Sequence, residues 1–167
     1  PLPEPLSTVQ VPEVPVTLPT PYTAEQIHRA FGRGKQLMFG METPEGEPVQ
    51  RWTVLEADEA TVTIEYKTQG QDEAATKTHT WVELQQHASF DAAETTRTEE
   101  TRTEALGTFE CWVYTRTRGE EVTTFVFAKE LPGPPLKMTT VVGGQPVFSM
   151  EQLKRSPTGD EASVLAR

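Results

Sequence analysis

Segments in which apolar and polar side chains alternate run through most of this sequence. Between residues 61 and 68, Val62, Ile64 and Tyr66 alternate with threonine and charged side chains. Successive side chains of a β-strand point to opposite faces, so this alternation predicts a strand with one buried face. Comparable patterns predict further strands at Gln36–Glu42, Gln50–Ala57, Thr76–Thr80, Thr108–Thr117, Glu121–Ala128, Leu136–Val142 and Gln145–Met150.

Two short helices are expected among these strands. Thr23 and Gln26 have the spacing of a capping box, and Thr80 and Glu83 repeat it. In such a box the threonine hydroxyl accepts from the third helical N–H, and the longer side chain reaches back to the N-cap. The helices should therefore begin directly after the two threonines and run to about residues 31 and 88.

The links between the predicted strands are mostly of hairpin length. No rhythm of strand, long helix and strand is present, which argues against a parallel sheet. The expected fold is therefore mainly β (α+β): a single curved antiparallel sheet or half-barrel of about seven to eight strands. The two short helices should lie against its concave face.

The two ends of the chain differ in composition from the middle. Residues 1–21 contain half of the 14 prolines and no glycine, which predicts an extended arm or tether. Residues 22–155 should form one globular domain, and residues 156–167 a mobile C-terminal tail. The valines of the arm leave a second interpretation open, in which it is an interaction element that docks on a partner.

The stretch from residue 94 to residue 118 has two unlike halves. Residues 94–104 are polar at every position and are rich in threonine, so they predict an exposed ribbon, an edge strand or the projecting end of a long strand. In Thr108–Thr117, Phe109, Cys111 and Val113 face one way while Trp112 and Tyr114 face the other. Both faces of that strand should therefore be covered.

Charge and cysteine content exclude several classes of protein. A net charge of −10 argues against sequence-independent nucleic-acid binding and against electrostatic attachment to anionic lipids. The single cysteine, Cys111, excludes a disulfide-rich scaffold and a zinc site built from several thiolates. No apolar run approaches the ~18 residues of a membrane span. The chain begins at Pro1, not Met, which points to a processed or a trimmed product and is compatible with a removed signal segment, with or without a lipidated cysteine.

A metal-dependent hydrolase is one functional hypothesis. His79, Glu83 and His87 are spaced four apart and would share a face of a continuous helix, where they could hold zinc. However, Thr80 should cap the helix, which places His79 outside it. A solvated face with a Glu83–His87 pair is the competing interpretation, and the sequence predicts no enzyme and no cofactor.

Cys111 paired with a histidine is a second catalytic hypothesis. Cys111 alternates with Phe109 and Val113, which places it toward the predicted core. No cation or helix N-terminus neighbours it in the sequence, so nothing there lowers its pKa. We expect it to act as a small buried apolar residue.

Aromatic and methionine side chains fall on nearly every predicted strand. In a closed sheet they would fill a core, whereas in a half-barrel some of them would line an apolar cavity. The proline-rich loop Leu131–Leu136 would form a rigid rim of that cavity. The candidate ligand-binding residues are Phe39, Trp52, Tyr66, Trp81, Trp112, Phe125, Phe127 and Met138.

The order of these elements resembles that of bacterial envelope proteins of the lipoprotein-carrier type, the LolA/LolB-like half-barrels, and of related periplasmic domains. The resemblance rests on the helix Thr23–Phe31 running into Gln36–Glu42, the strands Gln50–Ala57 and Thr61–Thr68, and the final run of strands from Gly107 to Met150. It covers about residues 22–155 and transfers no functional residue. It implies a concave apolar face that binds acyl chains.

These observations together predict a non-enzymatic, extracytoplasmic domain of the bacterial envelope. The favoured hypothesis is a tethered, lipoprotein-like module of the periplasm or outer surface that binds a lipid or apolar ligand in its concave sheet. The alternative is a structural or interaction module of a surface assembly. That module would bind an envelope partner through residues 1–21 and the threonine-rich edge strand.

Overall fold

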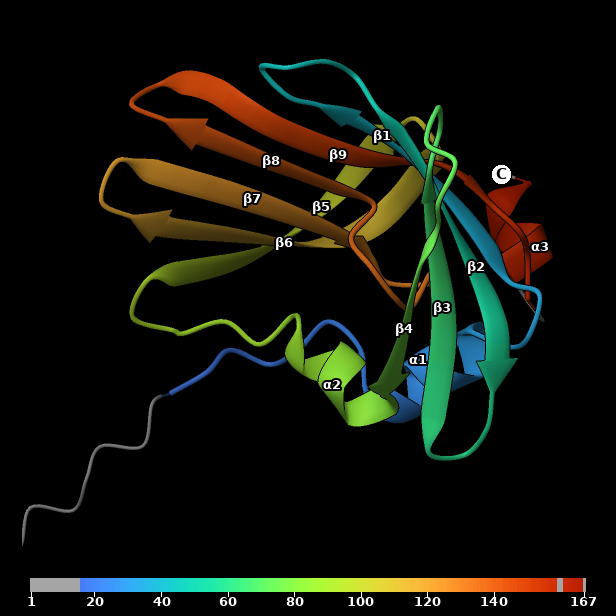
Figure 1. The fold of residues 1–167 in the computed structure, drawn as a ribbon. Coiled ribbons are helices and arrows are strands. Elements are labelled where there is room, and N and C mark those ends of the chain that lie inside the picture. Colours follow the sequence, from blue (N-terminus) through green and yellow to red (C-terminus); the bar gives the residue numbers. More distant parts are fainter. Residues whose placement is uncertain (1–15, 159–160, 167) are drawn as a thin grey trace, which may run out of the picture.

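The computed structural model describes residues 16–158 and 161–166 of the chain. Within them, nine antiparallel strands form one sheet in the order β4-β3-β2-β1-β9-β8-β7-β6-β5 (Figure 1). The strands are β1 (Gln36–Glu42), β2 (Val49–Ala57), β3 (Thr61–Thr68), β4 (Ala75–Thr80), β5 (Thr95–Glu104), β6 (Gly107–Arg118), β7 (Glu121–Ala128), β8 (Lys137–Val142) and β9 (Gln145–Arg155). The predicted fold class is confirmed, with a slightly higher strand count.

The sheet consists of two meanders that meet at its centre. Strands β1 to β4 run outward to one edge, and α2 carries the chain to the opposite edge at β5. Strands β5 to β9 then return, and β9 pairs with β1. Both edges of the sheet are therefore joined by one short helical connection.

The polar stretch predicted as an edge does form the edge strand β5. The chain reverses at residues 105–106, and Gly107 begins β6 with a φ of 146°, a conformation that favours glycine. β5 then pairs with β6 along its whole length, from Thr95 opposite Arg116 to Glu104 opposite Gly107. Its outer side has no strand partner among the described residues.

Both predicted capping boxes are present. Thr23 accepts from Gln26 N at the start of α1 (Ala24–Ala30), and Thr80 accepts from Glu83 N at the start of α2 (Trp81–Gln86). In each box the N3 side chain also accepts from the N-cap N–H. The three helices of the described residues are five to seven residues long, too short to cross a membrane.

The expected arm divides into two parts. Residues 1–15 lie outside the described residues. Residues 16–21 lie against the domain: Leu18 N donates to Phe90 O at 2.9 Å, and Tyr114 Oη donates to Pro19 O at 2.5 Å. These contacts have a simple cause, since the carbonyl and N–H groups of an extended segment remain available to polar groups that the domain has to satisfy.

The segment predicted as a C-terminal tail, residues 156–167, contains a short helix. Residues 161–165 form a third helix, α3 (Glu161–Leu165), whose Glu161 and Val164 are buried. Glu161 contacts Lys35, which is far from it in the sequence, and Arg155, which is the last residue of β9. These contacts fix the end of the chain to the domain.

Two apolar clusters lie on opposite faces of β6 and β7. The larger cluster includes Tyr114 and Phe127 and is covered by α1 and α2. The smaller one includes Cys111 and Val126 and is covered by Val164 of α3. The prediction that β6 is covered on both faces is confirmed.

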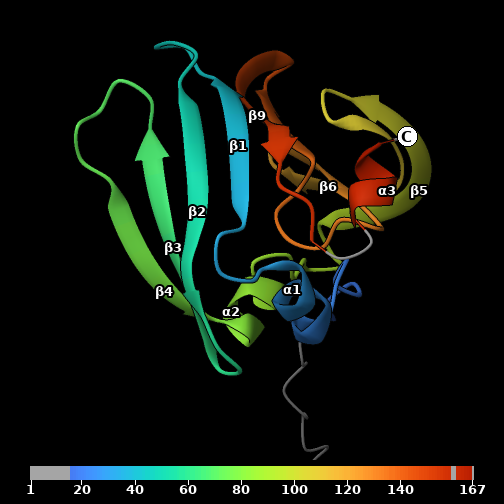
Figure 2. The ribbon, with the colours of Figure 1, turned by 90° about the vertical axis from the view of Figure 1, so that its right-hand side faces the viewer.

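The sheet is strongly coiled. Figure 2 shows β1–β4 standing opposite the part that contains β5 and β6, with α1 and α2 below both. The coiling brings the tip of the β5–β6 hairpin to β9, where Ala105 N donates to Glu151 Oε1 at 2.7 Å. The concave side of this half-barrel is therefore bounded by two walls and a helical floor.

Candidate functional site

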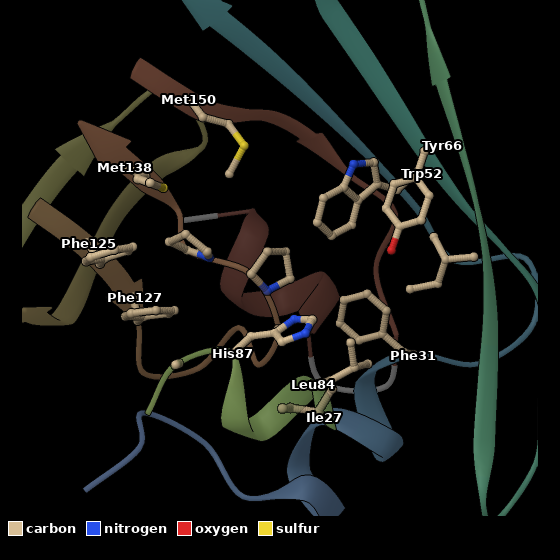
Figure 3. Close-up of a pocket in the computed structure, with 15 residues that line it drawn as sticks. Ile27, Phe31, Trp52, Tyr66, Leu84, His87, Phe125, Phe127, Met138 and Met150 are labelled. Atoms are coloured by element: carbon tan, nitrogen blue, oxygen red, sulfur yellow. The ribbon is translucent and has the colours of Figure 1, made fainter. Parts of the chain in front are cut away.

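An apolar pocket of about 240 Å³ lies between the two walls of the sheet and the helices (Figure 3). Its lining comes from both walls, from α1 and α2, and from the loop that connects β7 to β8. The lining residues are Ile27, Phe31, Trp52, Ile64, Tyr66, Leu84, His87, Ala88, Phe125, Phe127, Gly133, Pro134, Pro135, Met138 and Met150.

The wall formed by β2 and β3 presents two aromatic rings. Trp52 and Tyr66 are cross-strand partners whose ring centroids lie 5.0 Å apart in an edge-to-face arrangement. Trp52 Nε1 donates to Gln50 Oε1 at 2.8 Å, and Tyr66 Oη lies 3.0 Å from His79 Nε2. Because their polar atoms have partners in the protein, both rings can offer apolar surface to the pocket.

The opposite wall is a row of large side chains across three strands. Phe125 of β7 is opposite Met138 of β8, which is opposite Met150 of β9. Phe127 continues the wall toward the helices and lies parallel to Phe125, with an interplanar angle of 10°. Methionine is flexible and polarisable, so this wall can adapt to ligands of different shape.

The proline-rich loop forms part of the lining, and hydrogen bonds from side chains of β9 hold it in place. Gln152 Nε2 donates to Pro134 O and Pro135 O, at 3.1 Å each, and Arg155 Nη2 donates to Pro132 O at 2.8 Å. Leu131 and Leu136 are buried at the two ends of the loop. The structure thus places residues 133–135 at the pocket, where a rim was predicted.

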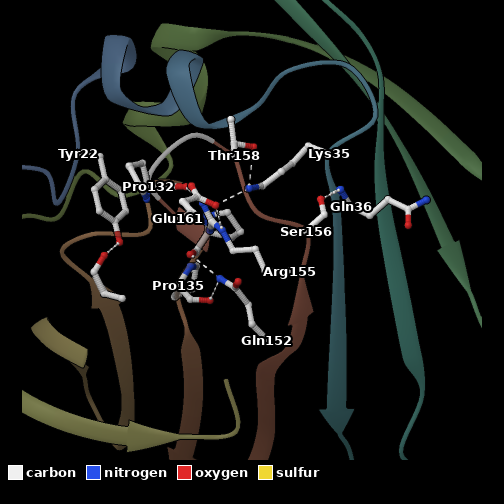
Figure 4. Close-up of polar contacts among 12 residues, drawn as sticks. Tyr22, Lys35, Gln36, Pro132, Pro135, Gln152, Arg155, Ser156, Thr158 and Glu161 are labelled. Atoms are coloured by element: carbon white, nitrogen blue, oxygen red, sulfur yellow. Dashed lines mark hydrogen bonds and ion pairs between the residues drawn. The ribbon is translucent and has the colours of Figure 1, made fainter. Parts of the chain in front are cut away.

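A buried ionic cluster near this loop joins Lys35, directly before β1, to Arg155 of β9 and Glu161 of α3 (Figure 4). Arg155 donates to Glu161 from Nε at 2.9 Å and from Nη2 at 2.8 Å, and Lys35 Nζ contacts the same carboxylate. Burial and the neighbouring Arg155 charge lower the pKa of Lys35 to about 8. Burial opposes ionisation of Glu161, but the bonds and charges of Arg155 and Lys35 outweigh it, and the pKa of Glu161 is lowered.

Five of the eight predicted ligand-binding residues line the pocket: Trp52, Tyr66, Phe125, Phe127 and Met138. The other three do not. Phe39 is fully buried behind Trp52, and Trp81 stacks on His28 with a centroid distance of 4.4 Å. Trp112 contacts the cationic groups of Arg97 and Lys129, each 4.2 Å from the ring centroid. A role in ligand binding stays a prediction for all eight.

Sequence reasoning missed the helical contribution to the pocket. Ile27 and Phe31 line the pocket from α1 and its C-cap, and Leu84 lines it from α2, but neither helix was predicted to reach a cavity. The signal was present in the spacing of these residues, since four positions along a helix return to the same face. Met150 is the cross-strand partner of Met138. Because both residues lie on predicted strands that are joined by a short turn, pairing these strands would have indicated Met150 as well.

The three residues of the metal hypothesis lie near one another without forming a metal site. His79 Nε2 is engaged with Tyr66, and His79 Nδ1 lies 3.9 Å from Glu83 Oε2. Burial, followed by the charges of His87 and Lys77, lowers the pKa of His79. Within the described residues, no group of three or more His, Cys, Asp or Glu side chains could hold a metal ion.

Cys111 is fully buried on the face of β6 that points away from the pocket. Its Sγ lies 3.3 Å from Phe109 O, and burial raises the pKa of the thiol to about 11. A thiol in this state is a poor nucleophile. Its position in the smaller apolar cluster fits the predicted packing role.

No protein-family model matches the chain, and no curated protein matches it either. Among solved structures, a chain from the MucA/MucB complex of Pseudomonas aeruginosa is similar, with a TM-score of 0.58 at 12% sequence identity. The match covers 83% of this chain and 56% of that chain, so this protein spans just over half of it. A protein of Bacteroides fragilis with a YmcC-like fold matches at a TM-score of 0.45 and 8% identity, covering 77% of this chain and 99% of that one. At these identities the likeness shows the fold alone, and the LolA/LolB-like resemblance stays a prediction.

Proposed function

We propose that this protein is a non-enzymatic domain of the bacterial cell envelope that binds the acyl chain of a lipid in its concave pocket. One observation carries the proposal: large apolar side chains from both walls of the sheet and both concave-side helices converge on a single unfilled volume. Apolar pockets with few polar groups are the usual form of small-ligand sites.

Physical chemistry specifies what such a pocket would bind. Each methylene group moved from water into it contributes about 0.8 kcal/mol, so affinity should rise with chain length until the pocket is filled. The polar atoms of Trp52 and Tyr66 are already satisfied by protein partners. The walls therefore favour a hydrocarbon chain over a ligand that needs many hydrogen bonds.

The proposed setting is extracytoplasmic. The fold is shared with a chain of the Pseudomonas aeruginosa MucA/MucB complex, and the net charge of −10 disfavours nucleic acid as a partner. In this proposal the proline-rich residues 1–21 act as a tether or contact an envelope partner. Such a tether would hold the pocket near a membrane without a membrane span.

A protein partner at the sheet edge is the second candidate function. It is favoured by the length of β5, whose ten residues pair only with β6 among the described elements, and by the occurrence of the fold in a protein complex. Half of the residues of β5 are charged, and charged edges oppose the addition of another strand. The pocket therefore supports the first candidate more strongly.

The test uses delipidated protein and N-phenyl-1-naphthylamine, an uncharged probe that fluoresces in apolar sites. Fatty acids of increasing length should displace the probe with increasing affinity. Met138→Glu should weaken binding at least about tenfold, because it places a charge in the lining. The matched control is Thr139→Glu, the next residue of β8, which is outside the pocket lining and should leave binding unchanged.

A second variant covers the case in which Met138→Glu fails to fold. Met138→Trp keeps the lining apolar but fills the pocket, and it should reduce binding while circular dichroism remains that of the wild type. Absence of probe binding to the folded wild type, or equal loss in both glutamate variants, would contradict the proposed function.

A further inference from the structure

On the concave face, the row of cross-strand residues next to the apolar pocket wall is polar. Thr95, Arg116, Thr123 and Thr140 are successive cross-strand partners on β5 to β8. Each of the last three lies two residues from Tyr114, Phe125 or Met138, so the polar row shares a face with the apolar one. The two rows are about 7 Å apart. An acyl chain that lies over Phe125 and Met138 would therefore place its end group at this polar row.

Arg116 is the charged member of this row, and it contacts the pocket wall directly. Its guanidinium carbon lies 5.4 Å from the ring centroid of Phe125, which lines the pocket. Within the described residues Arg116 forms no ion pair, and its Nε is buried without a hydrogen-bond partner. A buried N–H without a partner is costly, so it marks a place where a ligand atom would be stabilised.

The residue opposite Arg116 has the same property. Thr95 is 6% exposed, and its hydroxyl has no hydrogen-bond partner among the described residues. Two buried donors without hydrogen-bond partners therefore belong to residues that lie opposite each other on β5 and β6. By contrast, Thr123 Oγ1 and Thr140 Oγ1 lie 3.1 Å apart and satisfy each other.

Two carboxylates that precede β5 are already engaged, and Glu121, two residues from Thr123 on β7, lies opposite Arg118. Glu94 accepts from Arg118, with Nε and Nη2 each 2.8 Å from its Oε1. Asp91 Oδ1 accepts from Ala93 N at 2.9 Å. The cation of Arg116 thus remains available, although the chain as a whole is strongly acidic.

We propose that the ligand is an anionic amphiphile whose carboxylate or phosphate headgroup binds to Arg116 and the Thr95 hydroxyl. A guanidinium binds such groups through parallel N–H···O bonds, and its Nε is one of the two donors of a side-on contact. The acyl chain then lies in the pocket. This inference rests on the proposed function and adds the chemistry of the headgroup.

The experiment compares ligands that differ only in the headgroup. Decanoate, decyl phosphate and decanol each compete with N-phenyl-1-naphthylamine at neutral pH, and inorganic phosphate alone is the fourth competitor. The wild type should bind the two anionic amphiphiles at least about tenfold more tightly than decanol. Inorganic phosphate should displace neither the probe nor bound decanoate.

Variants then locate the headgroup. Arg116→Gln should reduce decanoate affinity to that of decanol and leave decanol binding unchanged, and Thr95→Val should lower decanoate affinity several-fold. The matched control, Arg51→Gln, removes the same charge from exposed Arg51 on β2, outside the pocket lining, and should preserve the preference. Unchanged decanol binding also shows that a variant has folded.

The outcomes separate the two claims. If no amphiphile displaces the probe, the proposed function fails. If decanoate and decanol bind equally to the wild type, or if Arg116→Gln keeps the preference, the headgroup assignment is overturned while the pocket remains. If inorganic phosphate displaces decanoate as effectively as decyl phosphate does, the site binds free phosphate, and the amphiphile assignment is overturned.

Discussion

The guanidinium of Arg155 holds the carboxylate of Glu161 in a two-point contact inside the protein, at 2.9 and 2.8 Å. Arg155 ends β9 and Glu161 begins α3, so this contact fixes the last helix to the sheet. Arg155 also donates to Pro132 O in the loop that lines the pocket. A single buried arginine therefore connects the end of the chain to the candidate site.

Removing the Glu161 charge should strongly destabilise the protein. Glu161→Gln leaves Lys35 and Arg155 buried without their neutralising partner, and such a loss costs about 3–5 kcal/mol. Urea unfolding measures the free energy of unfolding. The control is Glu25→Gln, which breaks the exposed Arg29–Glu25 pair and should cost less than about 1 kcal/mol. Equal costs for the two variants would show that the buried cluster contributes no more than a surface pair.

The same contact predicts a pH dependence. The pKa of Glu161 is lowered in the folded protein from its ordinary value of 4.5, so its ionised form stabilises the fold above that value. This stability is lost as the pH falls from that ordinary value through the folded pKa, because the unfolded state then binds a proton that the folded state excludes. The stability difference between the wild type and Glu161→Gln should therefore shrink as the pH falls below about 5. A difference that stays constant down to about pH 3 would rule out this explanation.

Gly133 should be intolerant of even the smallest side chain. Its φ is 132°, and a Cβ there would lie 2.5 Å from Cε2 of the Phe31 ring. Gly133→Ala should therefore lower the free energy of unfolding by about 1–3 kcal/mol, through backbone strain and overpacking. Gly32→Ala is the matched control, since a Cβ at Gly32 meets nothing within 4 Å. A Gly133→Ala variant with unchanged thermal stability would contradict this close approach of the loop to the Phe31 ring.

Cys111 should be protected from thiol reagents in the folded state. Burial raises its pKa to about 11, so at pH 8 few molecules carry the reactive thiolate, and the side chain is also inaccessible. Reaction with 5,5′-dithiobis(2-nitrobenzoate) should be at least about a hundredfold slower in buffer than in urea. Rapid stoichiometric labelling of the native protein would show that the smaller apolar cluster opens readily.

Local patterns predicted the local structure well. Thr23 and Thr80 form the expected capping boxes, because that geometry depends only on residues three apart. The alternation of Val62, Ile64 and Tyr66 predicted β3 for a similar reason, since one face of the strand is buried. The polarity of residues 94–104 likewise indicated an edge.

Long-range contacts could not be read from the sequence. The helix α3 is only five residues long, and its position depends on Lys35, more than a hundred residues away, so the sequence around Glu161 resembles a tail. The aromatic residues present a related problem. Phe39 and Trp52 are both apolar strand residues, and only the pairing and coiling of the sheet decide which of them lines the pocket.

The three tryptophans allow the most direct test of the central claim, that the pocket holds an acyl chain. Trp52 lines the pocket, whereas Trp81 is buried elsewhere against His28. Two variants are compared: Trp81→Phe/Trp112→Phe, which retains Trp52, and Trp52→Phe/Trp112→Phe, which retains Trp81. Brominated decanoate quenches tryptophan fluorescence on contact. We predict saturable quenching of Trp52 and none of Trp81; equal quenching of both, or binding without quenching of Trp52, would contradict the proposed site.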